Sequence, residues 1–335
     1  MTLQPTDLLA KTARDERAVV ALSEGADPRI VEGGLAAHAQ GLADIILVGP
    51  EEEVSAALSG AGGAIGEGIA MHDPSQSDLT SRFAEVYYDL RAKKGVTKEQ
   101  AAQAVNDPMI YAALLVREGH AMGTVGGAVA TTSDIVRAAI QMIGKAPDAA
   151  LVSSFFLMYP PEDGREGARA MLYSDSGLVI DPSSEELASI AEISAESFKA
   201  LKQDEPRIAM LSFSTKGSAR HATVTKVTTA TDALRQARPD LAVDGELQFD
   251  AAFVPSVGEK KAPDSDIAGR ANVMIFPNLD AGNIAYKITQ RLGGYTAIGP
   301  VMQGLNKPAN DLSRGCSAED VTQMIAVTVL QASAT

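Results

Sequence analysis

The sequence contains little of what several classes of protein need. Its 335 residues include one cysteine, no tryptophan and four histidines. The single cysteine, Cys316, excludes an intrachain disulfide and a metal site built from several thiolates. The histidines, at positions 38, 72, 120 and 221, do not have the spacing typical of metal ligands. We therefore expect an activity that needs no metal.

Long apolar runs and clustered positive charge are also missing. No segment approaches the roughly 20 apolar residues that a membrane-spanning helix requires, and the first residues lack the apolar core of a secretory signal. The formal net charge of -14 argues against nucleic acid as a partner, because phosphate backbones are bound by clustered Lys and Arg. The composition predicts a cytoplasmic enzyme without membrane contact, in which a local basic pocket holds any anionic substrate.

Short apolar runs alternate with amphipathic stretches along the chain. We expect strands over residues 18–22, 44–48, 122–125, 150–157, 207–213, 272–276 and 295–298. Helices are expected over 108–119, around 135–143 and over 184–201, where apolar residues recur on one face. The alternation predicts an α/β protein with mostly parallel sheets, and 335 residues are enough for about two domains.

The ten residues from Asp311 to Asp320, DLSRGCSAED, gather reactive groups around one expected helix start. Gly315 is typical of a turn and Ser317 of an N-cap, so Arg314 lies just before a helix N-terminus. Unpaired backbone N–H groups and a guanidinium there favour a bound phosphate. A structural interpretation is equally open, because Ser317 and Asp320 match a capping box.

Four segments in series resemble the phosphate acetyltransferase family, whose members exchange an acetyl group between acetyl phosphate and coenzyme A. They are VDGELQFDAAFVP (243–255), KAPDSDIAGRANVMIFPNLDAGNIAYKITQRL (261–292), AIGPVMQGL (297–305) and NKPANDLSRGCSAED (306–320). Looser matches in the N-terminal half are ALSEGADPRIVEGG, YYDLRAKKGVT and GTVGGAVATTSDIVRAAIQMI. The resemblance thus covers nearly the whole chain.

The resemblance implies two α/β domains with mostly parallel sheets, the architecture of isocitrate and isopropylmalate dehydrogenases, and an active site in the cleft between the domains. Domain I would comprise residues 1–147 and 307–335, and domain II, inserted into it, residues 148–306. The resemblance further implies a homodimer that acts on small molecules. Coenzyme A and acetyl-CoA would be substrates, and no cofactor would be bound permanently.

The resemblance assigns the central roles to residues of the C-terminal stretch. Asp320 matches the general base that takes the proton of the CoA thiol, Ser313 an assisting hydroxyl, and Arg314 the arginine that holds phosphate. A carboxylate in the first turn of a helix is a weak base unless burial offsets the stabilising N–H groups. The family transfers acetyl directly in a ternary complex, and Cys316 has no histidine beside it, so packing or proximity to substrate is its expected role.

Further contacts with phosphate or CoA are implied for Arg137, Arg91 and Lys287, with Tyr286 beside the last. Each basic residue has a structural alternative. Arg137 is spaced to pair with Asp134 at i, i+3. Arg91 suits the C-terminal end of a helix, and exposed lysines such as Lys287 are common on helix surfaces.

A glycine-rich run precedes the helix that carries Arg137. Its Gly127, Thr131 and Thr132 are candidates to bind phosphate through backbone N–H groups and hydroxyls, whereas a tight turn for close packing is the structural alternative. The run is neither a P-loop nor a dinucleotide-binding fingerprint, because the required lysine and glycine spacing are missing.

Three residues depart from the family pattern: Met122, Gly126 and Ala130 stand where the family commonly has Asp, Ser and His. The departures leave acyl selectivity open, so a phosphate acyltransferase for propionyl or butyryl groups is the first alternative. A non-catalytic acetyl-CoA sensor is the second, since related domains regulate malic enzymes. A metal-dependent decarboxylating dehydrogenase is the third, but the sequence lacks clustered carboxylates for a divalent ion and a nicotinamide site.

Overall fold

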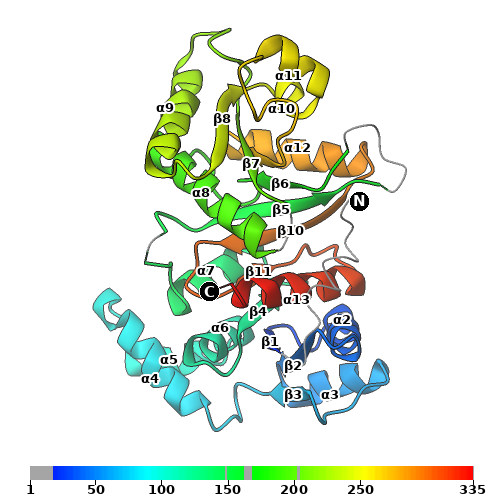
Figure 1. Cartoon of the computed structure of the whole chain (residues 1–335). Helices are drawn as coiled ribbons and strands as arrows, with labels where there is room; N and C mark the ends of the chain where they lie inside the picture. The colour runs from blue at the N-terminus through cyan, green and yellow to red at the C-terminus, as the bar shows by residue number, and fades with distance from the viewer. Residues whose placement is uncertain (1–17, 148, 162–167, 202–203, 335) are drawn as a thin grey trace. The chain divides into compact units, whose positions relative to one another are not determined.

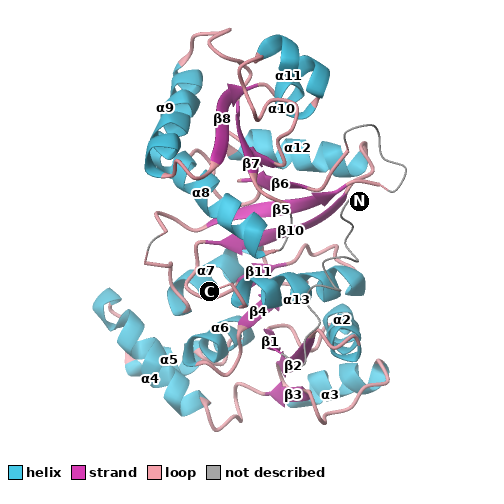
Figure 2. Cartoon of the chain, viewed as in Figure 1, coloured by secondary structure: helices cyan, strands magenta, loops and turns pink. Residues whose placement is uncertain are grey.

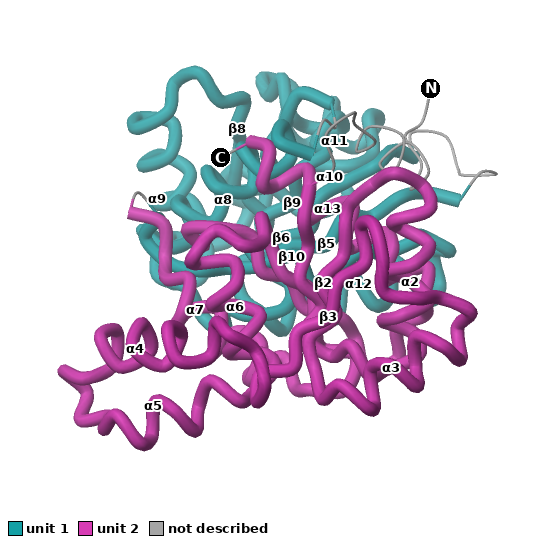
Figure 3. Tube along the Cα trace, turned by 90° about the horizontal axis from the view of Figure 1, so that it is seen from below, with its two compact units in different colours: residues 1–7, 148–304 teal, residues 8–147, 305–335 magenta. Residues whose placement is uncertain are grey.

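The computed structural model describes residues 18–147, 149–161, 168–201 and 204–334 (Figure 1). These residues form two sheets with surrounding helices (Figure 2). The sheets belong to two compact units, of which unit 1 contains Asp148–Gly304 and unit 2 contains Leu8–Pro147 and Leu305–Thr335 (Figure 3). No helix within the described ranges is long and apolar enough to cross a bilayer.

The sheet of unit 2 is entirely parallel, in the order β11-β4-β1-β2-β3. Its strands are β1 (Ala18–Leu22), β2 (Ala43–Val48), β3 (Ile69–His72), β4 (Gly123–Gly126) and β11 (Ala309–Asp311). β11 comes from the C-terminal part of the chain and pairs with β4, with Ala309 opposite Thr124. The C-terminal segment therefore completes this sheet.

Helices connect and cover the strands of unit 2. They are α2 (Pro28–Ala39), α3 (Glu51–Gly60), α4 (Thr80–Arg91), η1 (Ala92–Lys94), α5 (Lys98–Ala104), α6 (Pro108–Glu118), α7 (Thr132–Met142) and α13 (Ala318–Ala332). The buried helix α13 packs closely on α2, because a Cβ at Gly33 would overlap Val321, and Thr322 donates a 3.0 Å hydrogen bond to the Gly33 carbonyl. α13 also contacts β1 and β4, which fixes the segment between β11 and α13 at the sheet.

The sheet of unit 1 is mixed, in the order β10-β5-β6-β9-β7-β8. Its strands are β5 (Ser153–Tyr159), β6 (Met171–Ser174), β7 (Arg207–Leu211), β8 (Ala242–Leu247), β9 (Val273–Ile275) and β10 (Thr296–Gln303). Its helices are α8 (Ser184–Ala200), α9 (Ala222–Ala237), α10 (Phe249–Phe253), α11 (Pro255–Lys261) and α12 (Leu279–Arg291). The pairs of β5 with β10 and β6 are antiparallel, whereas β6, β9, β7 and β8 run parallel.

The structure confirms the α/β class and the mostly parallel sheets, and every strand expected from the sequence overlaps an observed one. The helix expected over 108–119 is α6, which ends at Gly119 in the left-handed conformation (φ 87°). One detail differs. Ile140 is 43% exposed, although the apolar pattern placed it on the buried face of α7. It follows Ile135 by five positions, which turns it about 140° away around the helix.

Candidate active site at the carboxyl edge of the unit 2 sheet

The carboxyl ends of β1, β4 and β11 lie at one edge of the unit 2 sheet, because the three strands are parallel neighbours. Glu24 follows β1, Gly127 follows β4, and Asp311 ends β11, two residues before Ser313. Open α/β sheets bind their ligands at this edge. The topology therefore brings the glycine-rich run and the C-terminal stretch to one place in unit 2.

The Glu24 carboxylate organises the loop that follows β4. It accepts hydrogen bonds from the backbone N–H groups of Gly127 (2.8 Å), Ala128 (2.7 Å), Val129 (3.0 Å) and Ala130 (2.6 Å). Converging N–H groups of this kind form a nest for an anion, and here the anion is a side chain of the protein itself. Phosphate binding by the Gly127 N–H would require Glu24 to leave the nest, so this assignment stays a prediction.

Gly127 also has the packing role that was the structural alternative. Its φ is 102°, a left-handed value that favours glycine. A Cβ on Gly127 would overlap Asp311 Oδ1 and lie 2.8 Å from the Leu312 nitrogen. The residue is therefore needed where the loop after β4 meets the end of β11.

Arg29 joins three segments of the edge. Its guanidinium contacts Asp27 through Nε (3.0 Å) and Nη2 (2.8 Å), and it donates to the carbonyl oxygens of Ala128 (2.8 Å), Arg314 (2.8 Å) and Cys316 (3.4 Å). The hydrogen bond from Arg29 is the main cause of the lowered pKa of Asp27. Arg29 thus holds the backbone on both sides of Gly315 while the Arg314 side chain remains outside the network.

Ser313 and Arg314 are exposed, as a substrate-binding pair must be. The Ser313 hydroxyl accepts a 3.2 Å hydrogen bond from the Gly315 N–H, which closes the expected turn. The Arg314 guanidinium has no partner among the described residues. Arg29 fixes the Arg314 backbone, while the Arg314 guanidinium is exposed and unpaired. This guanidinium can therefore bind an anionic oxygen without breaking an existing ion pair.

Asp320 forms the capping box that was the structural alternative for this stretch. Its Oδ2 accepts hydrogen bonds from the Ser317 N–H (2.8 Å) and hydroxyl (2.9 Å), and its own N–H donates to the Ser317 hydroxyl (3.2 Å). Asp320 is exposed, so the cap does not separate it from solvent. In the structure the carboxylate therefore serves in the cap of α13. Its role as the base stays a prediction.

Cys316 is 7% exposed, so its thiol is not accessible as a nucleophile would need to be. Burial raises the pKa of its thiol, while the charge of Arg29 acts in the opposite direction. The thiol form therefore dominates at neutral pH, which favours the packing interpretation over an acetyl-enzyme.

The two threonines at the start of α7 have different partners. Thr131 is the N-cap, and its hydroxyl donates to Asp134 Oδ2 (2.7 Å) at the surface. Thr132 donates instead to Asp311 Oδ2 (2.6 Å), a buried carboxylate. The expected Arg137–Asp134 pair is present at 2.8 Å, with the Arg137 side chain 60% exposed. A solvated pair of this kind is weak, so Arg137 can still exchange it for a substrate anion.

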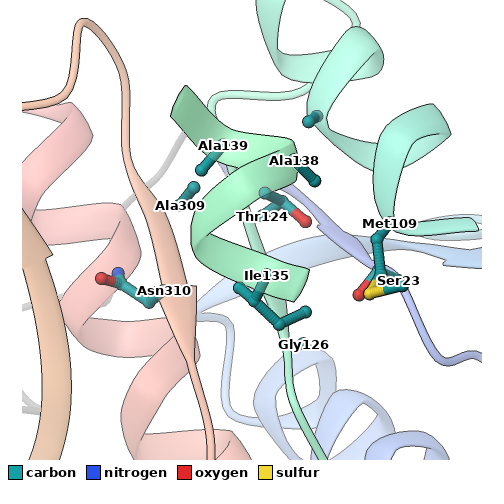
Figure 4. A pocket seen from close by; sticks show the side chains of 10 residues that line it. Ser23, Met109, Thr124, Gly126, Ile135, Ala138, Ala139, Ala309 and Asn310 are labelled. Carbon is teal, nitrogen blue, oxygen red and sulfur yellow. The ribbon is translucent and has the colours of Figure 1, made fainter. Parts of the chain in front are cut away.

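Two cavities adjoin the edge. A cavity of about 510 Å³ opens beside Glu24 and is lined by Asp27, Glu53, Met109 and Val129 among others, and none of its described lining residues apart from those carboxylates is charged. A phosphate is therefore not expected to bind in it. The second, of about 10 Å³, lies at the buried Ser23 hydroxyl (Figure 4) and has room for about one water molecule rather than a substrate.

The residues that depart from the family pattern occupy different places. Met122 precedes β4, so it lies at the amino end of the strand, away from the edge that carries Ser313. Gly126 ends β4, and a Cβ there would overlap the Ser23 hydroxyl. Ala130 donates its N–H to Glu24. Of the three, Ala130 is therefore placed to influence a substrate at this edge, whereas Gly126 is buried against Ser23.

The remaining predicted contacts lie elsewhere. Arg91 ends α4, and its Nε is buried without a partner among the described residues. Tyr286 and Lys287 belong to α12 of unit 1, where the Tyr286 ring stacks on Phe156 with 3.9 Å between ring centres and burial raises the pKa of Tyr286. Lys287 is exposed, with Nζ 5.7 Å from the centre of the Tyr286 ring. Within the part of the chain that the structure describes, no group of three or more His, Cys, Asp or Glu is placed to hold a metal ion.

Sequence reasoning missed the roles of Glu24, Arg29 and Asp311. Glu24 and Arg29 stand within the segment ALSEGADPR, in which Asp27 caps α2. The partners of Glu24 are more than 100 residues away in sequence. Only the position of these charged residues directly after an apolar strand could have indicated their place at the edge.

Several known proteins are similar to this chain over nearly its whole length. The family model described as phosphate acetyl/butaryl transferase matches residues 6–329. A phosphate acetyltransferase of Thermoanaerobacterium thermosaccharolyticum is 46% identical over 97% of this chain and 98% of its own length, and one of Paracoccus denitrificans is 46% identical over 98% and 99%. The crystal structure of a phosphotransacetylase from Streptococcus pyogenes is 41% identical, covers 99% of this chain and 100% of its own, and superposes with a TM-score of 0.91.

Proposed function

The chain belongs to the phosphate acetyl/butaryl transferase family, and from this premise we propose how it performs the family's reaction. It is a phosphate acetyltransferase, which interconverts acetyl-CoA and phosphate with CoA and acetyl phosphate. The site assignment rests on the exposed guanidinium of Arg314, which has no partner among the described residues. Ser313, which supplies the hydroxyl, is the preceding residue in the sequence. The edge of the unit 2 sheet is the place for phosphate in this proposal.

In the proposed reaction the CoA thiolate attacks the carbonyl carbon of acetyl phosphate within a ternary complex. A C–S bond forms, the C–O bond to phosphate breaks, and phosphate leaves with the electron pair. Arg314 stabilises the charge that develops on the phosphate oxygens, Ser313 donates a hydrogen bond, and Asp320 is the assigned base for the thiol proton. The buried Cys316 thiol, whose pKa is raised, supports direct transfer over an acetyl-enzyme.

Further assignments from the sequence remain part of the proposal. Arg137 and Thr131 lie at the same edge as Ser313 and are proposed to contact phosphate or CoA. Arg91, Tyr286 and Lys287 are proposed as additional substrate contacts. The domain limits predicted from the sequence, 1–147 with 307–335 and 148–306, also remain a proposal. CoA and acetyl-CoA are proposed as substrates, the location as cytoplasmic, and no permanently bound cofactor is required by the reaction.

The first test measures acetyl-CoA formation from acetyl phosphate and CoA in the presence of EDTA. We expect turnover with acetyl phosphate, and slower turnover with propionyl and butyryl phosphates. Ala130 bears on the longer chains, because a small residue at the edge leaves more room for an acyl group, whereas the space beside Gly126 is filled by Ser23. A preference for butyryl phosphate would mean that the enzyme transfers a longer acyl group rather than acetyl. CoA binding without turnover of any acyl phosphate would instead support the sensor alternative.

We also propose a homodimer, which the resemblance to the family implies. Light scattering coupled to size exclusion should give a molar mass near twice the 34.9 kDa of the chain. A monomer at every concentration that supports turnover would reject the dimer and leave the assigned reaction intact.

A further inference from the structure

The cavity of about 510 Å³ beside Glu24 has no ligand assigned to it. Three helices of unit 2 begin at this cavity, and each start carries a proline that lines it: Pro28 in α2, Pro50 before α3 and Pro108 in α6. The N–H groups of a helix start attract anions, but proline has no N–H group. The three prolines therefore make this part of the cavity wall apolar.

Carboxylates of the protein already accept other N–H groups of these helix starts. The hydrogen bonds run from the Arg29 N–H to Asp27 (2.9 Å), from the Glu51 N–H to Asp73 (3.0 Å) and from the Met109 N–H to Asp107 (2.8 Å). An anion in the cavity would also meet the carboxylates of Glu24, Asp27 and Glu53, which line it. The occupant that fits the cavity is therefore an uncharged, apolar group.

Arg29 links the cavity to the turn that carries Arg314. Its guanidinium bonds to Asp27, which lines the cavity, and donates to the Arg314 carbonyl at 2.8 Å. An acyl phosphate has a charged end, for which Arg314 is the proposed partner, and an uncharged acyl end. The cavity is separated from the turn by one arginine side chain, so the acyl end is the part of the substrate that the cavity suits.

Ser23 stands between this cavity and the smaller one of about 10 Å³. Ser23 and Met109 are the described residues that line both cavities (Figure 4). Ser23 is 3% exposed, and the small cavity is lined further by apolar side chains such as Ile135 and Ala139. Without the Ser23 side chain the two spaces would join, and an acyl chain in the larger cavity would gain room for further carbons.

Ser23 also fills the space that Gly126 leaves. Ser23 follows β1 and Gly126 ends β4, and these strands are parallel neighbours. A Cβ on Gly126 would overlap the Ser23 hydroxyl, yet it would lie 3.4 Å from the Ser23 Cβ, which is an ordinary contact. The φ of Gly126 is not left-handed, so this overlap is the main obstacle to a side chain there. The missing side chain at position 126 therefore does not enlarge the site.

We propose that the cavity beside Glu24 takes the acyl group of the acyl phosphate and that Ser23 limits the length of this group. Acetyl needs no space beyond Ser23, whereas the added carbons of propionyl or butyryl need the space that Ser23 and Met109 close. Ser23 is thus a specificity-determining residue from β1, and Ala130 lines the same cavity. The inference rests on the proposed function, because it concerns the acyl group that this reaction transfers.

The test measures kcat/KM of Ser23→Gly, Ser23→Ala and the wild type with acetyl, propionyl and butyryl phosphates. Ser23→Gly removes the whole side chain and should raise the ratio of propionyl to acetyl by about 10-fold or more, because one methylene in an apolar pocket changes kcat/KM by roughly that factor. Ser23→Ala removes the hydroxyl alone and should raise the ratio less.

Ser176→Gly is the matched control. Ser176 is also fully buried, its hydroxyl has no partner among the described residues, and it follows a parallel strand of unit 1. Ser176 lines neither cavity. Its replacement should therefore keep the wild-type ratio of propionyl to acetyl.

A side chain placed on the neighbouring strand should reverse the change. Gly126→Ala alone should lower the Tm by roughly 5 °C, because its Cβ overlaps the Ser23 hydroxyl. In the Ser23→Ala background the same substitution should lower the Tm much less and return the ratio of propionyl to acetyl toward the wild type. Equal losses of Tm in both backgrounds would show that the two positions do not share one space, and would overturn the inference.

The kinetic outcomes separate the inference from the proposed function. An unchanged ratio in folded Ser23→Gly, or an equal loss with all three acyl phosphates, would overturn the role of Ser23 while the reaction stands. A wild type that prefers butyryl phosphate would overturn it too, because Ser23 would then not limit the acyl group. A wild type that forms no thioester from any acyl phosphate would refute the proposed function and the inference together.

Discussion

Arg314→Ala is expected to lower kcat/KM for acetyl phosphate by about 10²- to 10³-fold, without unfolding the protein. The guanidinium is exposed and has no described partner, so its removal breaks no described ion pair. The contact that does hold this residue uses the backbone carbonyl, which accepts from Arg29 at 2.8 Å and is kept in the alanine variant. The loss should therefore appear in steady-state kinetics, with circular dichroism and the melting temperature unchanged.

Two further variants sharpen this test. Arg82→Ala removes an arginine that is 59% exposed and pairs with Glu118 at the surface of the same unit, so it should leave kcat/KM unchanged. Arg314→Lys keeps the charge but loses the planar fork, and should recover only part of the rate. Full activity in Arg314→Ala would reject the assigned phosphate site. Equal losses of activity in Arg82→Ala and Arg314→Ala would mean that the loss comes from the changed net charge of the protein.

Local sequence signals account well for the elements that present this site. Apolar strands, the Gly119 end of α6, and the Ser317–Asp320 capping box follow from residues within a few positions of each other, and all are found in the structure. The capping box also shows that one residue can have a structural role and still be available for a functional one. Asp320 completes the cap and remains exposed to a substrate.

Local sequence signals could not predict the long-range contacts. β11 is three residues long and pairs with a strand far away in the chain, so no periodicity could identify it. The glycine-rich run indicated an anion nest, but its composition could not show that the anion is Glu24. The environment of Asp311 depends on burial created by β4, α7 and the Glu24 loop together. These features arise only when the parallel strands bring their carboxyl ends to one edge.

Glu24→Gln is expected to lower the free energy of unfolding by about 3–5 kcal/mol, because an amide cannot accept all four N–H groups of the nest. Its NH₂ group would face donors, leaving at least two of the N–H groups from Gly127 to Ala130 unsatisfied, at about 1–3 kcal/mol each. Thermal unfolding should show a Tm lower by roughly 10 °C. Activity should fall as well, since the loop leads directly into Thr131 and Thr132 of α7.

The same substitution also tests the electrostatics of the edge. Removing the negative charge of Glu24 should lower the pKa of Asp311, which a pH titration of the Asp311 carboxyl signal by NMR would show. Glu53→Gln is the control, because Glu53 lines the same cavity but is exposed, and its loss at the start of α3 should cost less than about 1 kcal/mol. An unchanged Tm in Glu24→Gln would mean that the nest does not depend on a charged occupant, and phosphate would then be able to replace Glu24 there, as the glycine-rich run first suggested.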